Sequence, residues 1–90
     1  MVSAAIKVTG MVQGVGFRYF AMRQANTLGL TGYVKNMPDG SVELEVEGER
    51  NSVENFKSVL ERGPGYSLVE KVDINYGEYS AKYDKFSVEY

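Results

Sequence analysis

The chain has 90 residues, of which 43% are hydrophobic, and it carries 10 Lys and Arg against 12 Asp and Glu. This length accommodates one compact domain, residues 1–90, and not two. Cysteine and histidine are both absent, which excludes disulfides, thiol nucleophiles, histidine general bases and the common zinc sites. The net charge of −2 disfavours nucleic-acid binding through bulk charge.

The chain contains no stretch of about 18 or more apolar residues, and its start has neither the apolar segment nor the cleavage site of a secretion signal. We therefore expect no membrane partner and a cytoplasmic location, with which the absence of cysteine is consistent. Because Met1 is followed by only a short lead into the first patterned segment, we expect a free-standing protein, and we expect it to be a monomer.

The first third of the chain predicts a strand and then a helix. Ala4, Ile6 and Val8 recur with the period of two of a strand, which we expect to stop at Gly10. From residue 17 on, apolar residues recur at spacings of three and four, which predicts a helix ended by Gly29. The apolar stripe of this helix consists of Phe17, Phe20, Ala21, Ala25 and Leu28.

The middle of the chain predicts a hairpin. A strand at about residues 31–36 leads into Pro38-Asp39-Gly40, in which Pro presets one dihedral angle and Gly supplies a positive φ. The returning strand alternates apolar residues with Glu43, Glu45 and Glu47 and closes at Gly48. We therefore expect one face of this strand in the core and the other face acidic and solvated.

The last 40 residues predict a second helix and two strands. Asn51 is expected to cap the helix, with Glu54 three residues on, and Gly63-Pro64-Gly65 is expected to end it. Its apolar stripe consists of Val53, Phe56, Val59 and Leu60. Alternating apolar residues predict strands around residues 72–76 and 86–90, whereas residues 77–84 show the weakest pattern.

This order of elements, β-α-β-β-α-β with a possible terminal strand, is typical of an α+β ferredoxin-like fold, the split β-α-β sandwich. We expect an antiparallel sheet of four to five strands with both helices on one face. Because this fold hosts many unrelated functions, the function must be argued from its site.

Residues 10–18, between the first strand and the first helix, contain three glycines within seven residues. Glycines let backbone N–H groups turn toward a ligand, and the helix adds its unpaired N-terminal amides and its dipole. Arg18 adds a planar set of donors, so the segment predicts a phosphate site. It lacks the GK[ST] of a Walker loop and the third glycine of a dinucleotide turn. The alternative, a tight connection with a solvated Arg18, stays open on these residues alone.

Asn36 is the second candidate, at the end of a strand and just before the Pro-Asp-Gly turn. The alternative is a structural role, because Asn before a turn often bonds its own backbone.

These two segments together resemble the acylphosphatase family. Residues 10–18, GMVQGVGFR, are similar to its signature G-x-V-Q-G-V-x-F-R, and residues 32–42, GYVKNMPDGSV, to its signature G-[FYW]-[AVC]-K-N-x-x-x-G-x-V. The resemblance implies hydrolysis of the carboxyl-phosphate bond of small acyl phosphates, without metal or cofactor. One departure is Met37, where vertebrate members often have Thr, and some relatives pair their C-terminal carboxylate with the loop arginine.

The resemblance also implies residue roles. Arg18 would bind the phosphoryl oxygens and Asn36 would position the attacking water. The phosphoryl group would be held by the backbone amides of Gly10, Met11, Val12, Gln13, Gly14, Val15 and Gly16.

This chemistry fits the residue inventory. The transition state of phosphoryl transfer is loose, so positioning and electrostatics carry most of the catalysis. The carboxylate that leaves an acyl phosphate is stable as an anion, so no general acid is needed, whereas a phosphate monoester would need one. A chain without His or Cys therefore favours mixed anhydrides, which give a carboxylate and inorganic phosphate.

Two other readings remain open at this point. A non-catalytic ferredoxin-like module would bind an anion or single-stranded RNA, although Glu43, Glu45 and Glu47 would repel RNA phosphates on the sheet face. A structural role, as a domain related to those in larger hydrogenase-maturation or carbamoyl-transferring proteins, is the other.

Overall fold

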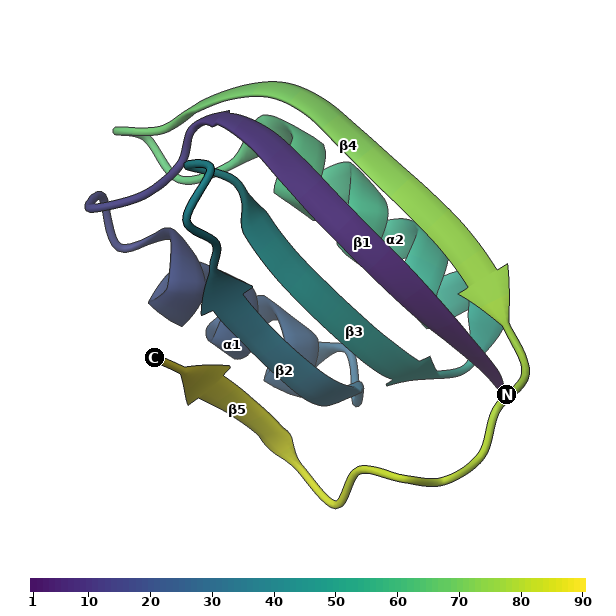
Figure 1. Cartoon of the computed structure of the whole chain (residues 1–90). Helices are drawn as coiled ribbons and strands as arrows, with labels where there is room; N and C mark the ends of the chain where they lie inside the picture. Colours follow the sequence, from purple (N-terminus) through teal and green to yellow (C-terminus); the bar gives the residue numbers. More distant parts are fainter.

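The computed structural model describes all 90 residues and contains five strands and two helices (Figure 1). In chain order these are β1 (Val2–Met11), α1 (Phe17–Thr27), β2 (Thr31–Asn36), β3 (Val42–Gly48), α2 (Arg50–Arg62), β4 (Leu68–Gly77) and β5 (Phe86–Glu89).

The strands form one sheet in the order β4-β1-β3-β2-β5. β1 pairs antiparallel with β3 and β4, and β2 pairs antiparallel with β3. β5 lies parallel to β2, with Gly32 opposite Phe86 and Lys35 opposite Glu89. The chain reverses once after β4 and crosses to the far edge of the sheet, so β5 takes the direction of β1 and β2 (Figure 1). The predicted ferredoxin-like fold is confirmed, and the terminal strand makes the sheet mixed.

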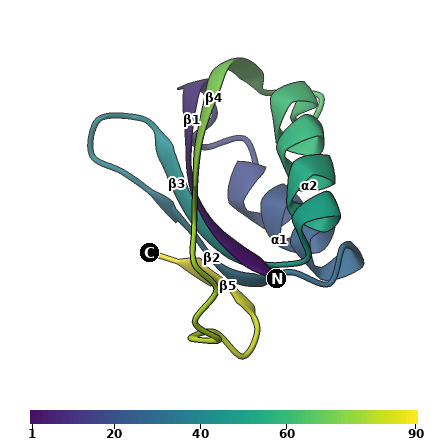
Figure 2. The ribbon, with the colours of Figure 1, turned by 90° about the vertical axis from the view of Figure 1, so that its right-hand side faces the viewer.

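Both helices cover one face of the sheet, and the core lies between the two layers (Figure 2). The predicted periodicities are confirmed: Ala4, Ile6 and Val8 of β1 are buried, as are three residues of each helix. These are Phe17, Ala21 and Ala25 in α1 and Val53, Phe56 and Leu60 in α2. The other predicted stripe residues, Phe20, Leu28 and Val59, are only partly buried. Phe86 of β5 packs edge-on against Phe56, with ring centroids 6.2 Å apart. Neither helix is long and apolar enough to cross a membrane.

β1 continues one residue beyond the predicted stop and ends at Met11. Gly10 permits this extension, because the pairing with β4 shifts its register between Thr9 and Gly10. Gly10 has φ +132°, and a Cβ at this position would lie 2.1 Å from the carbonyl oxygen of Leu68. The glycine therefore allows two backbones to approach closely inside the sheet.

The start of α2 also differs from the prediction. Asn51 lies inside the helix, which begins at Arg50, and the N-cap residue is Glu49, without a capping side chain. Glu49 has an extended backbone directly after β3, and its carbonyl oxygen accepts the first helical bond from the N–H of Val53 at 3.0 Å. The chain turns into α2 at Glu49, directly after β3 ends at Gly48. The helix therefore begins before Asn51, the residue predicted to cap it.

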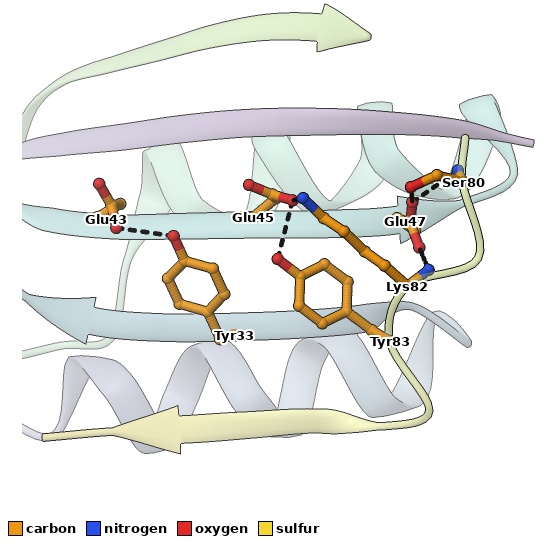
Figure 3. Close-up of polar contacts among 7 residues, drawn as sticks. All are labelled: Tyr33, Glu43, Glu45, Glu47, Ser80, Lys82 and Tyr83. Carbon is orange, nitrogen blue, oxygen red and sulfur yellow. Dashed lines mark hydrogen bonds and ion pairs between the residues drawn. The ribbon is translucent and has the colours of Figure 1, made fainter. Parts of the chain in front are cut away.

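The predicted solvated acidic face of β3 is wrong for Glu47, which is only 1% exposed. Residues 78–85, between β4 and β5, lie across the end of this face (Figure 3). One oxygen of Glu47 accepts the backbone N–H of Ser80 at 3.0 Å, and the other accepts that of Lys82 at 3.0 Å. The N–H groups of an irregular segment have no neighbouring strand to accept their hydrogen bonds, and here the Glu47 carboxylate is the acceptor instead.

The two neighbouring glutamates are also bonded. Glu45 accepts the Tyr83 hydroxyl at 2.8 Å and pairs with Lys82 at 2.6 Å, and Glu43 accepts the Tyr33 hydroxyl at 2.7 Å (Figure 3). The Lys82 contact lowers the pKa of the Glu45 carboxyl. Burial raises the pKa of the Tyr83 hydroxyl above its usual range. Glu45 and Glu47 therefore hold the β4–β5 connection, whereas Glu43 bonds to β2.

Candidate active site

The loop between β1 and α1, residues 12–16, leads into the N-terminus of α1. Gly14 and Gly16 have φ +76° and +77°, in the left-handed region that glycine adopts without strain. Gly16 is the N-cap of α1, and no side chain caps the helix. The first-turn amides of a helix have no intrahelical acceptor. The positive end of α1 and these amides are therefore available to an anion.

A small cavity of about 130 Å³ lies at this helix end. It brings together the two side chains predicted from the sequence, Arg18 and Asn36, although 18 residues separate them in the chain. No acidic side chain lines it, and its volume is below that of pockets for larger organic ligands. The full lining is Val12, Gly14, Gly16, Phe17, Arg18, Tyr19 and Asn36. The arrangement suits a small anion.

A larger cavity, of about 430 Å³, lies on the helix-free face between β1, β4 and the β2–β3 turn. Its charged lining is Lys7, Asp39, Glu43 and Asp73, with an ion pair of 3.3 Å between Lys7 and Asp39. Three carboxylates against one ammonium disfavour a phosphate there. We therefore assign the chemistry to the smaller cavity.

The other residues of the predicted phosphate site lie around the cavity rather than on its lining. Gly10 and Met11 are the last residues of β1, opposite Val69 and Leu68 of β4. Gln13 and Val15 belong to the loop but do not line the cavity. The role of these four backbone amides in phosphate binding stays a prediction.

The Arg18 guanidinium makes two contacts within the protein, both with the C-terminal end of the sequence. Its Nη1 donates to the backbone carbonyl of Glu89 at 2.9 Å, and its Cζ lies 4.4 Å from the centre of the Tyr90 ring. A guanidinium has five N–H donors in a planar fork, so most of its donors remain for an anion in the cavity.

Two tyrosines complete this edge of the site. Tyr19 lines the cavity, and its hydroxyl lies 2.5 Å from that of Tyr90. This hydrogen bond raises the pKa of the Tyr90 hydroxyl. The contact joins the first turn of α1 to the end of β5 and supports the ring that stacks on Arg18.

Asn36 is the last residue of β2. Alternation along the strand puts its side chain on the face of Val34, toward the helices. Its Oδ1 is buried and has no hydrogen-bond partner, so this oxygen is not engaged with the Asn36 backbone, as the structural alternative required. A buried acceptor without a partner costs about 1–3 kcal/mol. Beside a cavity, the natural donor to this oxygen is a water molecule.

Gln13 links the loop to the β2–β3 turn. Its side-chain Nε2 donates to the carbonyls of Met37 and Ser41, both at 2.8 Å. Sequence reasoning missed this contact and those of Tyr19, Glu89 and Tyr90, because these partners are 24 to 71 residues apart. For the contacts of Glu89 and Tyr90, the parallel pairing of β5 with β2 would have been the necessary signal, and no local pattern encodes it.

Comparison with known proteins adds an independent finding. A sequence model of the acylphosphatase family matches residues 4–88. The chain belongs to the acylphosphatase family. The resemblance predicted from the two signatures is thereby confirmed, and the loop, Arg18 and Asn36 fall within the matched range.

Relatives in this family match along the whole chain. An acylphosphatase from Archaeoglobus fulgidus is 43% identical over 90 residues, with 100% of both chains covered. One from Thermotoga maritima is 42% identical over 89 residues, covering 92% of this chain and 99% of that protein.

The fold matches solved structures in the same way. The crystal structure of acylphosphatase from Bacillus subtilis superimposes with a TM-score of 0.96 at 37% identity, with 100% of both chains covered. Full-length HypF, determined in a phosphate- and nucleotide-bound form, matches with a TM-score of 0.87 at 31% identity. That match covers 98% of this chain and 12% of HypF, so the acylphosphatase fold also occurs as part of a much larger protein.

Proposed function

We propose that the protein is an acylphosphatase, which hydrolyses the carboxyl-phosphate bond of small acyl phosphates to a carboxylate and inorganic phosphate. Membership of the family supports the reaction class. The observation that carries the proposal is the small cavity in which the glycine loop, Arg18 and the unpartnered Oδ1 of Asn36 meet. The reaction needs no metal or cofactor.

The phosphoryl group binds at the N-terminus of α1. Backbone N–H groups of the loop and of the first helical turn donate to its oxygens, and Arg18 donates from the rim of the cavity. In a loose transition state the charge spreads over three equatorial oxygens, and fixed donors stabilise it without reorganisation. Glu89 and Tyr90 keep the guanidinium in place.

Asn36 positions the attacking water. Its buried Oδ1 accepts a hydrogen bond from the water and turns a lone pair of the water oxygen toward phosphorus. In a loose transition state, water needs alignment more than deprotonation. No general base is required, and none lines the cavity.

The leaving group sets the substrate class. An acyl phosphate releases a carboxylate, whereas a phosphate monoester releases an alkoxide that needs a proton donor. Arg18 and Asn36 are poor acids at neutral pH. We therefore assign the activity to acyl phosphates, and we propose that the 90 residues act as one domain, as a monomer in the cytoplasm.

The direct test is steady-state hydrolysis of benzoyl phosphate in EDTA, beside p-nitrophenyl phosphate, on the wild type and Asn36→Ala. We expect cleavage of benzoyl phosphate alone. In Asn36→Ala, kcat should fall about a hundred- to a thousandfold with little change in KM, because the variant removes one preorganised group. Asn26→Ala, in the exposed part of α1, is the matched control. A folded wild type that binds phosphate without cleaving benzoyl phosphate would instead indicate an anion-binding module.

A further inference from the structure

The two halves of the cavity come from separate parts of the chain. The loop and Arg18 follow β1, whereas Asn36 ends β2. β1 and β2 are not neighbours in the sheet, because β3 lies between them. The ladders join Asn36 to β1 only through β3, where Val42 lies opposite both Val8 and Asn36. They do not include loop residues 12–16, so a contact outside the sheet is needed to join the loop itself to Asn36.

The side chain of Gln13 makes that contact. Both N–H groups of its amide have acceptors, the carbonyls of Met37 and Ser41, at 2.8 Å each. Gln13 immediately precedes Gly14, which lines the cavity, and Met37 immediately follows Asn36. The tether is thus one residue away from the cavity lining at each end.

The β2–β3 turn, which accepts the two hydrogen bonds of Gln13, is also held by its own backbone hydrogen bonds. Met37 N–H donates to the Ser41 carbonyl at 2.9 Å, and Gly40 N–H donates to the Met37 carbonyl at 3.1 Å. Each acceptor of Gln13 therefore keeps another donor if Gln13 is removed. Loss of the tether would free the loop from the turn without leaving a carbonyl unpaired.

Asn36 depends on this backbone for its position, because its Oδ1 has no protein partner. We propose that Gln13 is a positioning residue, whose side chain fixes the distance between the phosphate loop and the Asn36 amide. The proposal rests on the proposed function, in which Asn36 aligns water against a phosphoryl group held by the loop. The side-chain donors of Gln13 are both engaged by the turn, so this side chain acts through Asn36 and not on the substrate.

The main test variant is Gln13→Met, which keeps the length and neutrality of the side chain but has no donors. The other glutamine, Gln24 on α1, makes no side-chain hydrogen bond, and Gln24→Met is the matched control. In Gln13→Met we expect kcat to fall about tenfold to a hundredfold, since a small misplacement of reacting groups has effects of this size. KM and inhibition by inorganic phosphate should change little.

A structural role alone would not reproduce the coupling to Asn36. If Gln13 acts through Asn36, then Gln13→Met should change kcat by less than about twofold when Asn36 is already Ala, because the two losses are not additive. An equal loss in both backgrounds, or an unchanged kcat in the single variant, overturns the proposal.

A second readout does not depend on turnover. In ¹⁵N-labelled wild type, inorganic phosphate should shift the amide signals of Gly14 and Gly16 and the side-chain amide of Asn36 with one Kd. In Gln13→Met the glycine signals should still shift, whereas the Asn36 response should be lost. An Asn36 response equal to that of the wild type overturns the proposal, whether or not benzoyl phosphate is cleaved.

Discussion

Two irregular segments of this molecule present backbone N–H groups that no strand pairs, and they satisfy them differently. In residues 78–85, the N–H groups of Ser80 and Lys82 donate to the buried carboxylate of Glu47. In residues 12–16, at the uncapped start of α1, no protein carboxylate is near the cavity. In residues 78–85 a protein carboxylate accepts the free N–H groups and fixes the segment. In residues 12–16 the N–H groups are left for an anionic ligand.

The comparison explains where negative charge lies in an acidic protein. Glu43, Glu45 and Glu47 lie on the helix-free face of the sheet, and all three accept hydrogen bonds there (Figure 3). The small cavity at the N-terminus of α1 has Arg18 as its one charged lining residue. A net charge of −2 is thus compatible with anion binding, because the local field matters more than the total.

Of the two segments, residues 12–16 should give the larger effect on activity when an anion-binding group beside them is removed, as in Arg18→Ala. This variant removes the guanidinium that supplements the loop donors, so binding and rate should fall together. We expect kcat/KM for benzoyl phosphate to fall about a thousandfold and inhibition by inorganic phosphate to weaken. The control is Arg23→Ala, exposed on the same helix. Near-normal turnover of Arg18→Ala would remove Arg18 from the mechanism.

The contacts of the other segment, residues 78–85, are weakened by Glu47→Gln. This change removes a buried charge that accepts two backbone N–H groups and places an N–H₂ group against one of them. We expect a loss of about 2 kcal/mol in the free energy of unfolding in urea, with kcat unchanged for the folded protein. Glu70→Gln, exposed on β4, should cost less than about 0.5 kcal/mol. Equal stability of the two variants would show that the Glu47 contacts contribute nothing.

A smaller effect is expected from replacing single glycines, and comparing Gly14→Ala with Gly29→Ala separates the cost of backbone strain from an effect on ligand binding. Gly14 and Gly29 have φ +76° and +71°, and a Cβ would meet no atom within 4 Å at either position. Gly14→Ala and Gly29→Ala should therefore lose similar stability, about 1 kcal/mol each. Gly14→Ala alone should also lose activity, about tenfold, because a tilted loop misdirects its N–H donors. Equal activity of the two variants would mean that the loop conformation does not matter for turnover.

Much of the fold could be predicted because local patterns and tertiary burial agree. The alternation in β1 and most of each helix stripe place in the core residues that the structure buries. Alternation does not report what covers the other face of a strand, and for this reason the burial of Glu47 was missed. The cap at Asn51 failed for a related reason, since Glu49 turns the chain before Asn51 is reached.

The candidate site divides in the same way. Arg18 could be named from the sequence because the glycines before it indicate an anion site, whereas Asn36 received its role through the resemblance of residues 32–42 to the family signature. The residues that hold the site together could not, because Gln13, Glu89 and Tyr90 act across the fold rather than along the chain. Their chemistry is ordinary, and only the sheet order shows which partners they meet.

The parallel pairing of β5 with β2 has a consequence for self-association. β2 would otherwise present an open row of backbone N–H and C=O groups, and such an edge is a template for pairing with another copy. β5 covers β2 from Gly32 to Lys35 and ends the sheet with a strand of four residues, too short to extend it readily. The strand that places the carbonyl of Glu89 against Arg18 thereby also protects this edge of the sheet from pairing with another copy.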